Sequence, residues 1–297
     1  MTQNDYLDSI PNLNSKDFAK KALIHFNNYL LIKELQEKSY IELLLEFKQD
    51  AKLYNELGNI KQHLINNGLH PRTIRTYFNQ IKLYLRYNNI RIYNEDVKTF
   101  VRFPKIQKEE KIPLDRKTIQ KLLDNSDNHV KFVILGLVSS GCRVSEILQL
   151  LYSDLKFPFV KIRSEIAKTG VGRTTFFTSQ VWDIINLLKS QTDSDDYVFC
   201  SEYQPKVSLD ELERKFDTVR KRSGLTDRYK TSRYHHVTIH RFRSFCKTQA
   251  SQVCDKDFAE GLIGHEGYLG TYNSLSDEEK LDNYKKLESR FIFTLNN

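Results

Sequence analysis

The sequence has 297 residues, of which 39% are hydrophobic and 28% charged, and its formal net charge is +8 at pH 7. The length favours two domains over a single core, and the composition excludes a disordered chain. No apolar run approaches the roughly 20 residues of a membrane span. The N-terminus "MTQNDYLDSIPNLNSKDF" is no secretory signal. The cysteines lack CxxC spacing, which indicates reduced thiols, a cytoplasmic setting and no metal site.

The first part of the chain is predicted to be helical. Apolar residues recur at three- and four-residue spacing over residues 16–65, with no proline and no glycine before Gly58. Gly68 and Pro71 then interrupt the pattern, and "HPRTIRTYFNQIKLYLRYNNI" begins a new amphipathic helix. One stripe of this helix is apolar, formed by Ile74, Tyr77, Phe78, Ile81, Tyr84 and Leu85.

Two long stretches of the chain contain no acidic residue, Leu57–Asn94 and Arg228–Cys254. Two separate basic stretches in a two-domain chain predict a polyanion that is bound from two sides, and double-stranded DNA is the partner that we expect. Solvated basic faces without a ligand are the alternative. The candidate DNA-binding residues of the first stretch are Lys61, Arg72, Arg75, Lys82, Arg86 and Arg91.

The second part of the chain begins after a linker. Two prolines and mixed charge mark residues 102–113 as extended, and a capped helix follows with Asp115 as its N-cap. Next, "HVKFVILGLVSSGCRVSEILQL" predicts a buried helix, a glycine break and another helix start. A β-hairpin is predicted around the turn "KTGVGR", and helices return from "SQVWDIINLLKS" onward.

The predicted fold class is therefore mainly α with a small β-sheet. The predicted segments are 1–40, a helical extension to which no role is assigned; 41–101, a helical domain; 102–113, the linker; and 114–297, a larger domain.

Several polar residues carry signals that are weak one by one. Arg143 and Glu146 are three apart on one helix face, the spacing of a local ion pair. Lys168 is predicted at the end of a strand, before the hairpin turn. Lysines at such turns usually increase solubility, but from this position an ammonium can also reach a DNA phosphate. His240 and Arg243 share a helical face in "HRFR".

One further histidine completes the set, and the order of the set is informative. His265 follows Gly264 in "LIGH", where a histidine alone more often caps or packs. An arginine box, a hairpin lysine, HxxR, GH and then tyrosines, downstream of a basic helical domain, resemble the tyrosine recombinase (phage integrase) family from about residue 40 onward. The resemblance implies a helical core-binding DNA domain and a tyrosine recombinase catalytic domain. The tail "GYLGTYNSLSDEEKLDNYKK" is most similar to integrases of archaeal viruses and mobile elements.

The resemblance implies a reaction that needs no ATP, metal or other cofactor. A tyrosine phenolate attacks a DNA phosphodiester and leaves a 3′-phosphotyrosyl bond and a free 5′-hydroxyl, and the hydroxyl of another strand reverses the attack. Guanidiniums suit the charge on the non-bridging oxygens, a lysine suits protonation of the leaving oxygen, and histidines bond the phosphate or accept the phenol's proton. The implied residues are Arg143 and Arg243, Lys168, then His240 and His265, with Glu146 orienting an arginine or a histidine.

The spacing of the tyrosines departs from the family. The family's nucleophile follows the GH histidine by about nine residues, whereas Tyr268, Tyr272 and Tyr284 follow His265 by three, seven and nineteen. Tyr272 is the predicted nucleophile and Tyr284 the alternative, because Tyr268 is too close and is predicted to pack. The shortened spacing suggests a tyrosine on a mobile segment, or one delivered to a neighbouring protomer.

Three functions remain open on the sequence. The first is a site-specific recombinase that integrates or excises a virus or other mobile element, acting as a homotetramer on DNA in the host cytoplasm. The second is a Xer-like dimer resolvase, and the third is a catalytically silent DNA-binding protein of the same fold. The apolar end "RFIFTL" either docks on the next subunit of such a tetramer or closes its own core.

Overall fold

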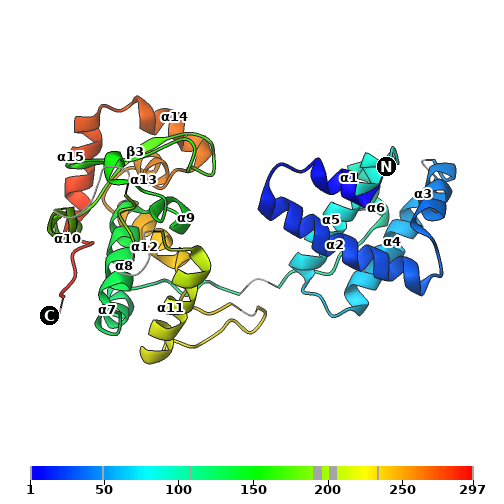
Figure 1. The fold of residues 1–297 in the computed structure, drawn as a ribbon, viewed down its shortest axis with the longest axis horizontal. Coiled ribbons are helices and arrows are strands. Elements are labelled where there is room, and N and C mark those ends of the chain that lie inside the picture. The colour runs from blue at the N-terminus through cyan, green and yellow to red at the C-terminus, as the bar shows by residue number, and fades with distance from the viewer. Residues whose placement is uncertain are drawn as a thin grey trace. The chain divides into compact units, whose positions relative to one another are not determined.

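The computed structural model describes residues 2–48, 50–107, 109–189, 196–200, 206–232 and 234–295. The chain divides into two compact units, Met1–Lys108 and Glu109–Asn297 (Figure 1). Each unit has its own hydrophobic core. No described helix is both long enough and apolar enough to span a membrane.

The first unit is a bundle of helices without a described strand. Its helices are α1 (Gln3–Asp8), α2 (Leu13–Ile32), α3 (Glu37–Glu46), α4 (Ala51–Asn66), α5 (Pro71–Tyr87) and α6 (Asn94–Phe100). Helix α2 packs against both α4 and α5, and α1 packs against α2 and α5. Residues 1–40 therefore share one core with residues 41–101, because α1 and α2 bury Tyr6 and Phe26 against Tyr84 of α5.

Helix α5 shows why this unit folds as the periodicity predicts. Pro71 occupies the first turn, where no backbone N–H is needed, and the His70 side chain caps the start. The predicted stripe is buried at Ile74, Phe78, Ile81, Tyr84 and Leu85, and half-buried at Tyr77.

The second unit is built around α8, which runs through its middle in Figure 1. Every residue of α8 from Phe132 to Ser140 is buried, and α7, α9, α10, α11, α12 and β3 all contact it. The helices of this unit are α7 (Arg116–Asp124), α8 (Asn128–Ser140), α9 (Val144–Ile147), α10 (Ser179–Lys189), α11 (Leu209–Arg222), α12 (His240–Ala250), α13 (Lys256–Leu262), α14 (Glu266–Ser274) and α15 (Asp277–Glu288). The predicted N-cap of α7 is confirmed, because the Asp115 carboxylate accepts a hydrogen bond of 2.7 Å from the Thr118 N–H.

A three-stranded antiparallel sheet lies in the same unit, in the order β1–β2–β3. Its strands are β1 (Leu155–Lys156), β2 (Phe159–Ile162) and β3 (Arg173–Phe176), and a 3₁₀ turn, η1 (Tyr152–Asp154), precedes them. The β2–β3 hairpin is confirmed, with Ile162 paired to Arg173. The prediction that Lys168 ends a strand is wrong: it lies inside the connecting loop, which closes turns of its own through the Ala167 N–H to the Arg163 carbonyl and the Gly170 N–H to the Ala167 carbonyl.

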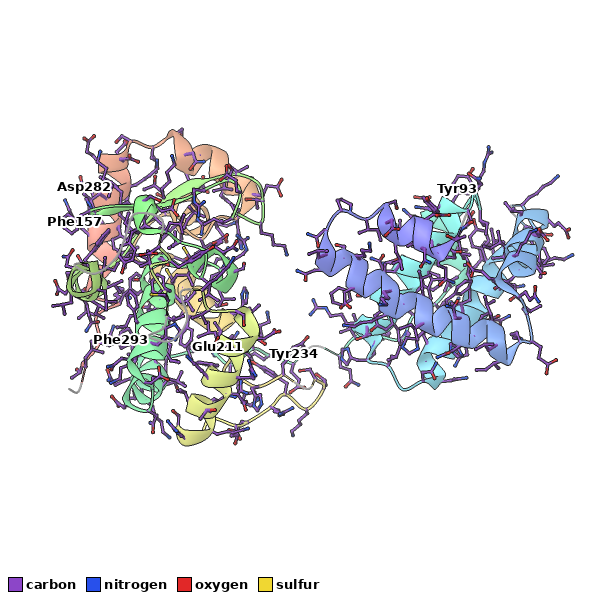
Figure 2. The ribbon with its side chains drawn as sticks, in the orientation of Figure 1. Tyr93, Phe157, Glu211, Tyr234, Asp282 and Phe293 are labelled. Atoms are coloured by element: carbon purple, nitrogen blue, oxygen red, sulfur yellow. The ribbon has the colours of Figure 1, made fainter. Side chains whose placement is uncertain are left out.

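The C-terminal segment closes its own unit. After α15 ends, Phe291 and Phe293 are buried in the same core as α8. The Arg116 guanidinium stacks 4.6 Å from the centre of the Phe293 ring and donates to the carbonyls of Arg290 and Ile292. Figure 2 shows Phe293 on this segment, between α15 and the C-terminus. The C-terminal segment therefore closes its own core rather than docking on another subunit.

Candidate active site

Arg143 caps a short helix and is held by Glu146. Helix α8 ends at Gly141 in a left-handed conformation (φ 62°), which turns the chain into α9. The Glu146 carboxylate accepts 2.9 Å from the Arg143 backbone N–H and 2.7 Å from its Nη1. The predicted local ion pair is therefore present, with the Glu146 side chain fully buried and the Arg143 side chain 19% exposed.

A second arginine, which the sequence did not single out, shares the same carboxylate. Arg173, the first residue of β3, donates 2.8 Å from Nη2 to Glu146 and 3.0 Å from Nε to the Leu262 carbonyl. Burial alone would raise the pKa of Glu146, but the charges and hydrogen bonds of Arg173 and then Arg143 outweigh burial and lower it. Glu146 is therefore an anion between two cations.

Arg243 reaches the same place from α12. Its Nη1 donates 2.8 Å to the carbonyl of Gly141, next but one to Arg143. Burial, and then the positive charges of Arg143 and Arg173, lower the pKa of Arg243 to about 10. Its Nη2 is buried and has no hydrogen-bond acceptor among the described residues. A buried N–H without an acceptor is costly unless a ligand supplies one.

His240 lies one helical turn before Arg243 and is exposed. Partial burial, and then the charges of Arg243, Lys111 and Arg143, lower the pKa of His240 below its ordinary 6.5. The imidazole is therefore neutral at pH 7 and can accept a proton.

His265 is the N-cap of α14 and is anchored by Glu260. Its Nδ1 contacts the Glu260 carboxylate, and its backbone N–H donates 3.0 Å to the Glu260 carbonyl. The ammonium of Lys247 pairs with the same carboxylate. With Nδ1 engaged, Nε2 is the ring nitrogen left for a substrate. The turn before it is tied to the first arginine, because Arg143 Nη2 donates 3.4 Å to the Gly264 carbonyl.

The two candidate nucleophiles are buried. The Tyr272 hydroxyl donates 2.8 Å to the Thr174 carbonyl, and the Tyr284 hydroxyl donates 3.1 Å to the Ser139 carbonyl. Burial raises the pKa of both phenols. Tyr268, predicted to pack, is half-buried, with the Lys256 ammonium 5.7 Å from the centre of its ring.

The structure thus brings together part of the predicted set. Arg143, Glu146 and Arg243 meet at the end of α8, with His240 at the start of α12 and His265 at the N-cap of α14 beside them. Lys168 is exposed in its loop and has no ion pair within the described ranges. Arg173 was missed; the one available signal was an arginine at the start of a short strand whose other residues are apolar or β-branched.

The basic residues of the first unit mostly contact their own chain. Lys61 donates 3.2 Å to the Arg102 carbonyl, and Arg75 stacks 5.5 Å from the centre of the Phe103 ring. Lys82 and Arg86 lie beside each other on α5 and reach the chain that follows it, with the Lys82 ammonium donating 3.0 Å to Asn94. The remaining two side chains, Arg72 and Arg91, are exposed.

Comparison with protein families gives a match over much of the second unit. The model of the phage integrase family matches residues 113–277, which is more than half of the chain and includes every candidate catalytic residue except Tyr284.

Curated archaeal proteins are similar over most of the chain. Tyrosine recombinase XerA of Saccharolobus solfataricus is 25% identical over 243 residues, covering 80% of this chain and 76% of the relative. Tyrosine recombinase XerA of Pyrococcus furiosus is 25% identical over 271 residues, covering 85% and 88%. A probable integrase/recombinase protein of Methanocaldococcus jannaschii is 28% identical over 266 residues, covering 80% and 75%.

Solved structures share the fold. A lambda integrase dimer bound to a core site is 17% identical with a TM-score of 0.55, over 87% of this chain and 98% of the other. The integrase of the transposon Tn1549, in complex with a circular intermediate DNA, is 14% identical with a TM-score of 0.54, over 90% and 99%. At these identities the likeness establishes the mainly helical fold with its small sheet.

Proposed function

Because the chain belongs to the phage integrase family, we propose that it is a site-specific recombinase that cleaves and rejoins double-stranded DNA through a 3′-phosphotyrosyl bond, to integrate or excise a mobile element. One observation carries the proposal. Arg143 lies just after the turn that ends α8, and Arg243, carried by α12, donates to the Gly141 carbonyl of that turn, close enough that the charge of Arg143 lowers the pKa of Arg243. Arg243 also keeps one buried N–H without an acceptor among the described residues.

The two arginines stabilise the negative charge of the reaction. A phosphodiester seated between them would accept from the buried Nη2 of Arg243 and from Arg143, and the phosphorane has more charge to share than the ground state. Since Glu146 already holds the Arg143 guanidinium, little reorganisation is needed when DNA binds.

The proton transfers fall to the remaining groups. His240 is neutral at pH 7 and is the base for the phenol, while His265 offers Nε2 to a phosphate oxygen. Lys168, at the exposed tip between β2 and β3, is the acid for the leaving 5′-oxygen and must be carried to the phosphate when the loop meets DNA.

Tyr272 is the proposed nucleophile, with Tyr284 second. In the free protein its hydroxyl is bonded to the Thr174 carbonyl, so attack requires α14 to release it. The released tyrosine serves its own site or that of a neighbouring copy in a homotetramer on DNA. The first unit contacts the phosphate backbone of the duplex through the side chains of Lys61, Arg72, Arg75, Lys82, Arg86 and Arg91.

A second function is favoured by the names of the relatives. Two similar archaeal proteins are called tyrosine recombinase XerA. A Xer-like resolvase would use the same groups on sites that lie in one molecule. A plasmid with two sites in direct repeat separates the two functions, because a resolvase divides it efficiently, whereas an integrase joins two unlinked sites.

The cleavage itself is tested by covalent trapping. Nicked duplexes that tile the DNA flanking the gene are incubated with the protein, and adducts are resolved on denaturing gels. We expect one duplex family to give an adduct with the wild-type protein and none with Arg143→Ala. A protein that binds these duplexes with sequence preference but forms no adduct with any of them would be a silent DNA-binding protein.

A further inference from the structure

Arg173 is buried where a cation has no solvent to stabilise it. Its side chain is 1% exposed, and its acceptors are the Glu146 carboxylate at 2.8 Å, the Leu262 carbonyl at 3.0 Å and, weakly, the Cys142 sulfur at 3.8 Å. A buried guanidinium persists only where such partners offset its loss of hydration. With Nε and Nη2 directed to protein atoms and the side chain only 1% exposed, Arg173 is not placed to touch DNA.

The contacts of Arg173 join the two halves of the proposed site. Through Glu146 it acts on Arg143, because the one carboxylate accepts from both guanidiniums. Through the Leu262 carbonyl it fixes the end of α13, two residues before the turn that carries His265.

The turn itself fits around the Arg173 guanidinium. Gly264 adopts a φ of 73°, and a Cβ at this position would lie 2.8 Å from Cζ of Arg173. The Gly264 carbonyl in turn accepts from Arg143 Nη2. Arg173 therefore fills the space beneath the Gly264 turn. The carbonyl of the same turn accepts from Arg143, which Arg173 helps to hold through Glu146.

We infer that Arg173 is a positioning residue for strand cleavage. By sharing the Glu146 carboxylate, it lets that carboxylate orient Arg143 without fully neutralising its charge. Arg173 also supports the turn that presents His265. The inference rests on the proposed function. Without Arg173, the full charge of Glu146 would act on Arg143 and draw it away from the phosphate, and the Gly264 turn would lose its support.

The chain provides a matched control. Arg163, the residue after β2, also pairs with a carboxylate, Asp154 at 2.9 Å, and donates 2.9 Å to a backbone carbonyl, that of Gln149. It contacts neither Glu146 nor the turn before His265. Arg163→Met therefore removes a side-chain ion pair and a carbonyl contact beside the same sheet, while the Arg163 carbonyl that closes the loop turn, Glu146 and the Gly264 turn keep their contacts.

The experiment uses the full chain and the nicked duplex that traps the wild-type protein. Rates of adduct formation at saturating protein, and affinities for the intact duplex, are measured below the melting temperature of each variant. We expect Arg173→Met to slow adduct formation about 100-fold, as a small displacement of reacting groups does, with unchanged duplex affinity. Arg163→Met should cleave at close to the wild-type rate.

Two further variants separate positioning from general support of the fold. Arg173→Lys keeps the charge but replaces donors on two nitrogens, Nε and Nη2, by donors on one, so its rate should lie between those of the wild type and Arg173→Met. In the double variant Glu146→Gln with Arg173→Met, no unbalanced carboxylate draws on Arg143, so the combined loss should be smaller than the product of the single losses.

The contrary results are equally definite. An Arg173→Met rate equal to that of Arg163→Met overturns the inference, and so does a parallel loss of cleavage and duplex affinity. If Arg173→Met does not fold, Arg173→Lys decides: a wild-type rate overturns the inference, and a reduced rate at unchanged affinity supports it. Absence of any wild-type adduct with all of the tiled nicked duplexes overturns the recombinase proposal itself, and this inference with it.

Discussion

Glu146 serves two cations with one carboxylate. Its side chain is fully buried, and it survives as an anion because Arg173 and Arg143 both donate to it. Removing one member of such a buried group leaves another charge without compensation, which costs about 3–5 kcal/mol. The identity of this residue therefore matters to folding as well as to chemistry.

The pH dependence of stability should reveal this carboxylate. The pKa of Glu146 is lowered in the folded protein from the ordinary 4.5, so its contribution is present above pH 4.5 and is lost as the pH falls through the lower folded value. Melting of the wild type and of Glu146→Gln between pH 7 and pH 3 should show a difference in unfolding free energy that narrows below about pH 4.5. A difference that stays constant over this range would contradict the assignment.

Substitution of Tyr272 and Tyr284 by phenylalanine should have similar effects on stability but different effects on cleavage. Tyr272→Phe and Tyr284→Phe each remove a hydroxyl that donates to a buried backbone carbonyl, so each should lower the unfolding free energy by a similar amount, about 1 kcal/mol. Only Tyr272→Phe should abolish the covalent adduct with the nicked duplex. An adduct that survives in Tyr272→Phe and disappears in Tyr284→Phe would move the nucleophile to α15.

At the scale of elements, the C-terminal segment is part of the core of the second unit. Phe291 is fully buried beside Phe245 and Tyr284, while the next residue, Ile292, is 38% exposed. Phe291→Ala should lower the unfolding free energy by about 3–5 kcal/mol, and Ile292→Ala by much less. The loss should be the same at all protein concentrations. A loss that appears only at high concentration would show that the segment docks on another copy in solution.

The elements themselves were largely predictable, since their signals are local. The apolar stripe of α5, the Asp115 cap and the β2–β3 hairpin all follow from spacing within one segment. The loop around Lys168 was mispredicted because its turns depend on hydrogen bonds inside the loop, which alternation does not encode.

The support of the site was not predictable in the same way. Arg173 is separated from Glu146 by 27 positions and from Leu262 by 89, so no periodicity links them. The predicted set of arginines and histidines came from the order of the motifs. The burial of the two phenols came from tertiary packing, which that order does not specify.

At the scale of the whole molecule, two cores imply two folding units. Their buried residues form separate clusters, one on each side of the division at Lys108. We expect calorimetry of the full chain to resolve two transitions, each reproduced by a fragment, residues 1–108 or residues 109–297. One joint transition, with neither fragment folded alone, would contradict this expectation.

The seat of Tyr272 has a consequence for when the enzyme can act. Gly261 of α13 leaves no room for even a methyl group against this ring, so the Tyr272 side chain is closely packed against α13. Withdrawing it to reach a phosphorus opens an aromatic-sized hollow, a loss of about 3–5 kcal/mol by analogy with truncating a buried ring. For the proposed nucleophile Tyr272, attack on DNA therefore requires duplex contacts whose binding free energy exceeds this loss, and the free protein is protected against cleaving DNA at random.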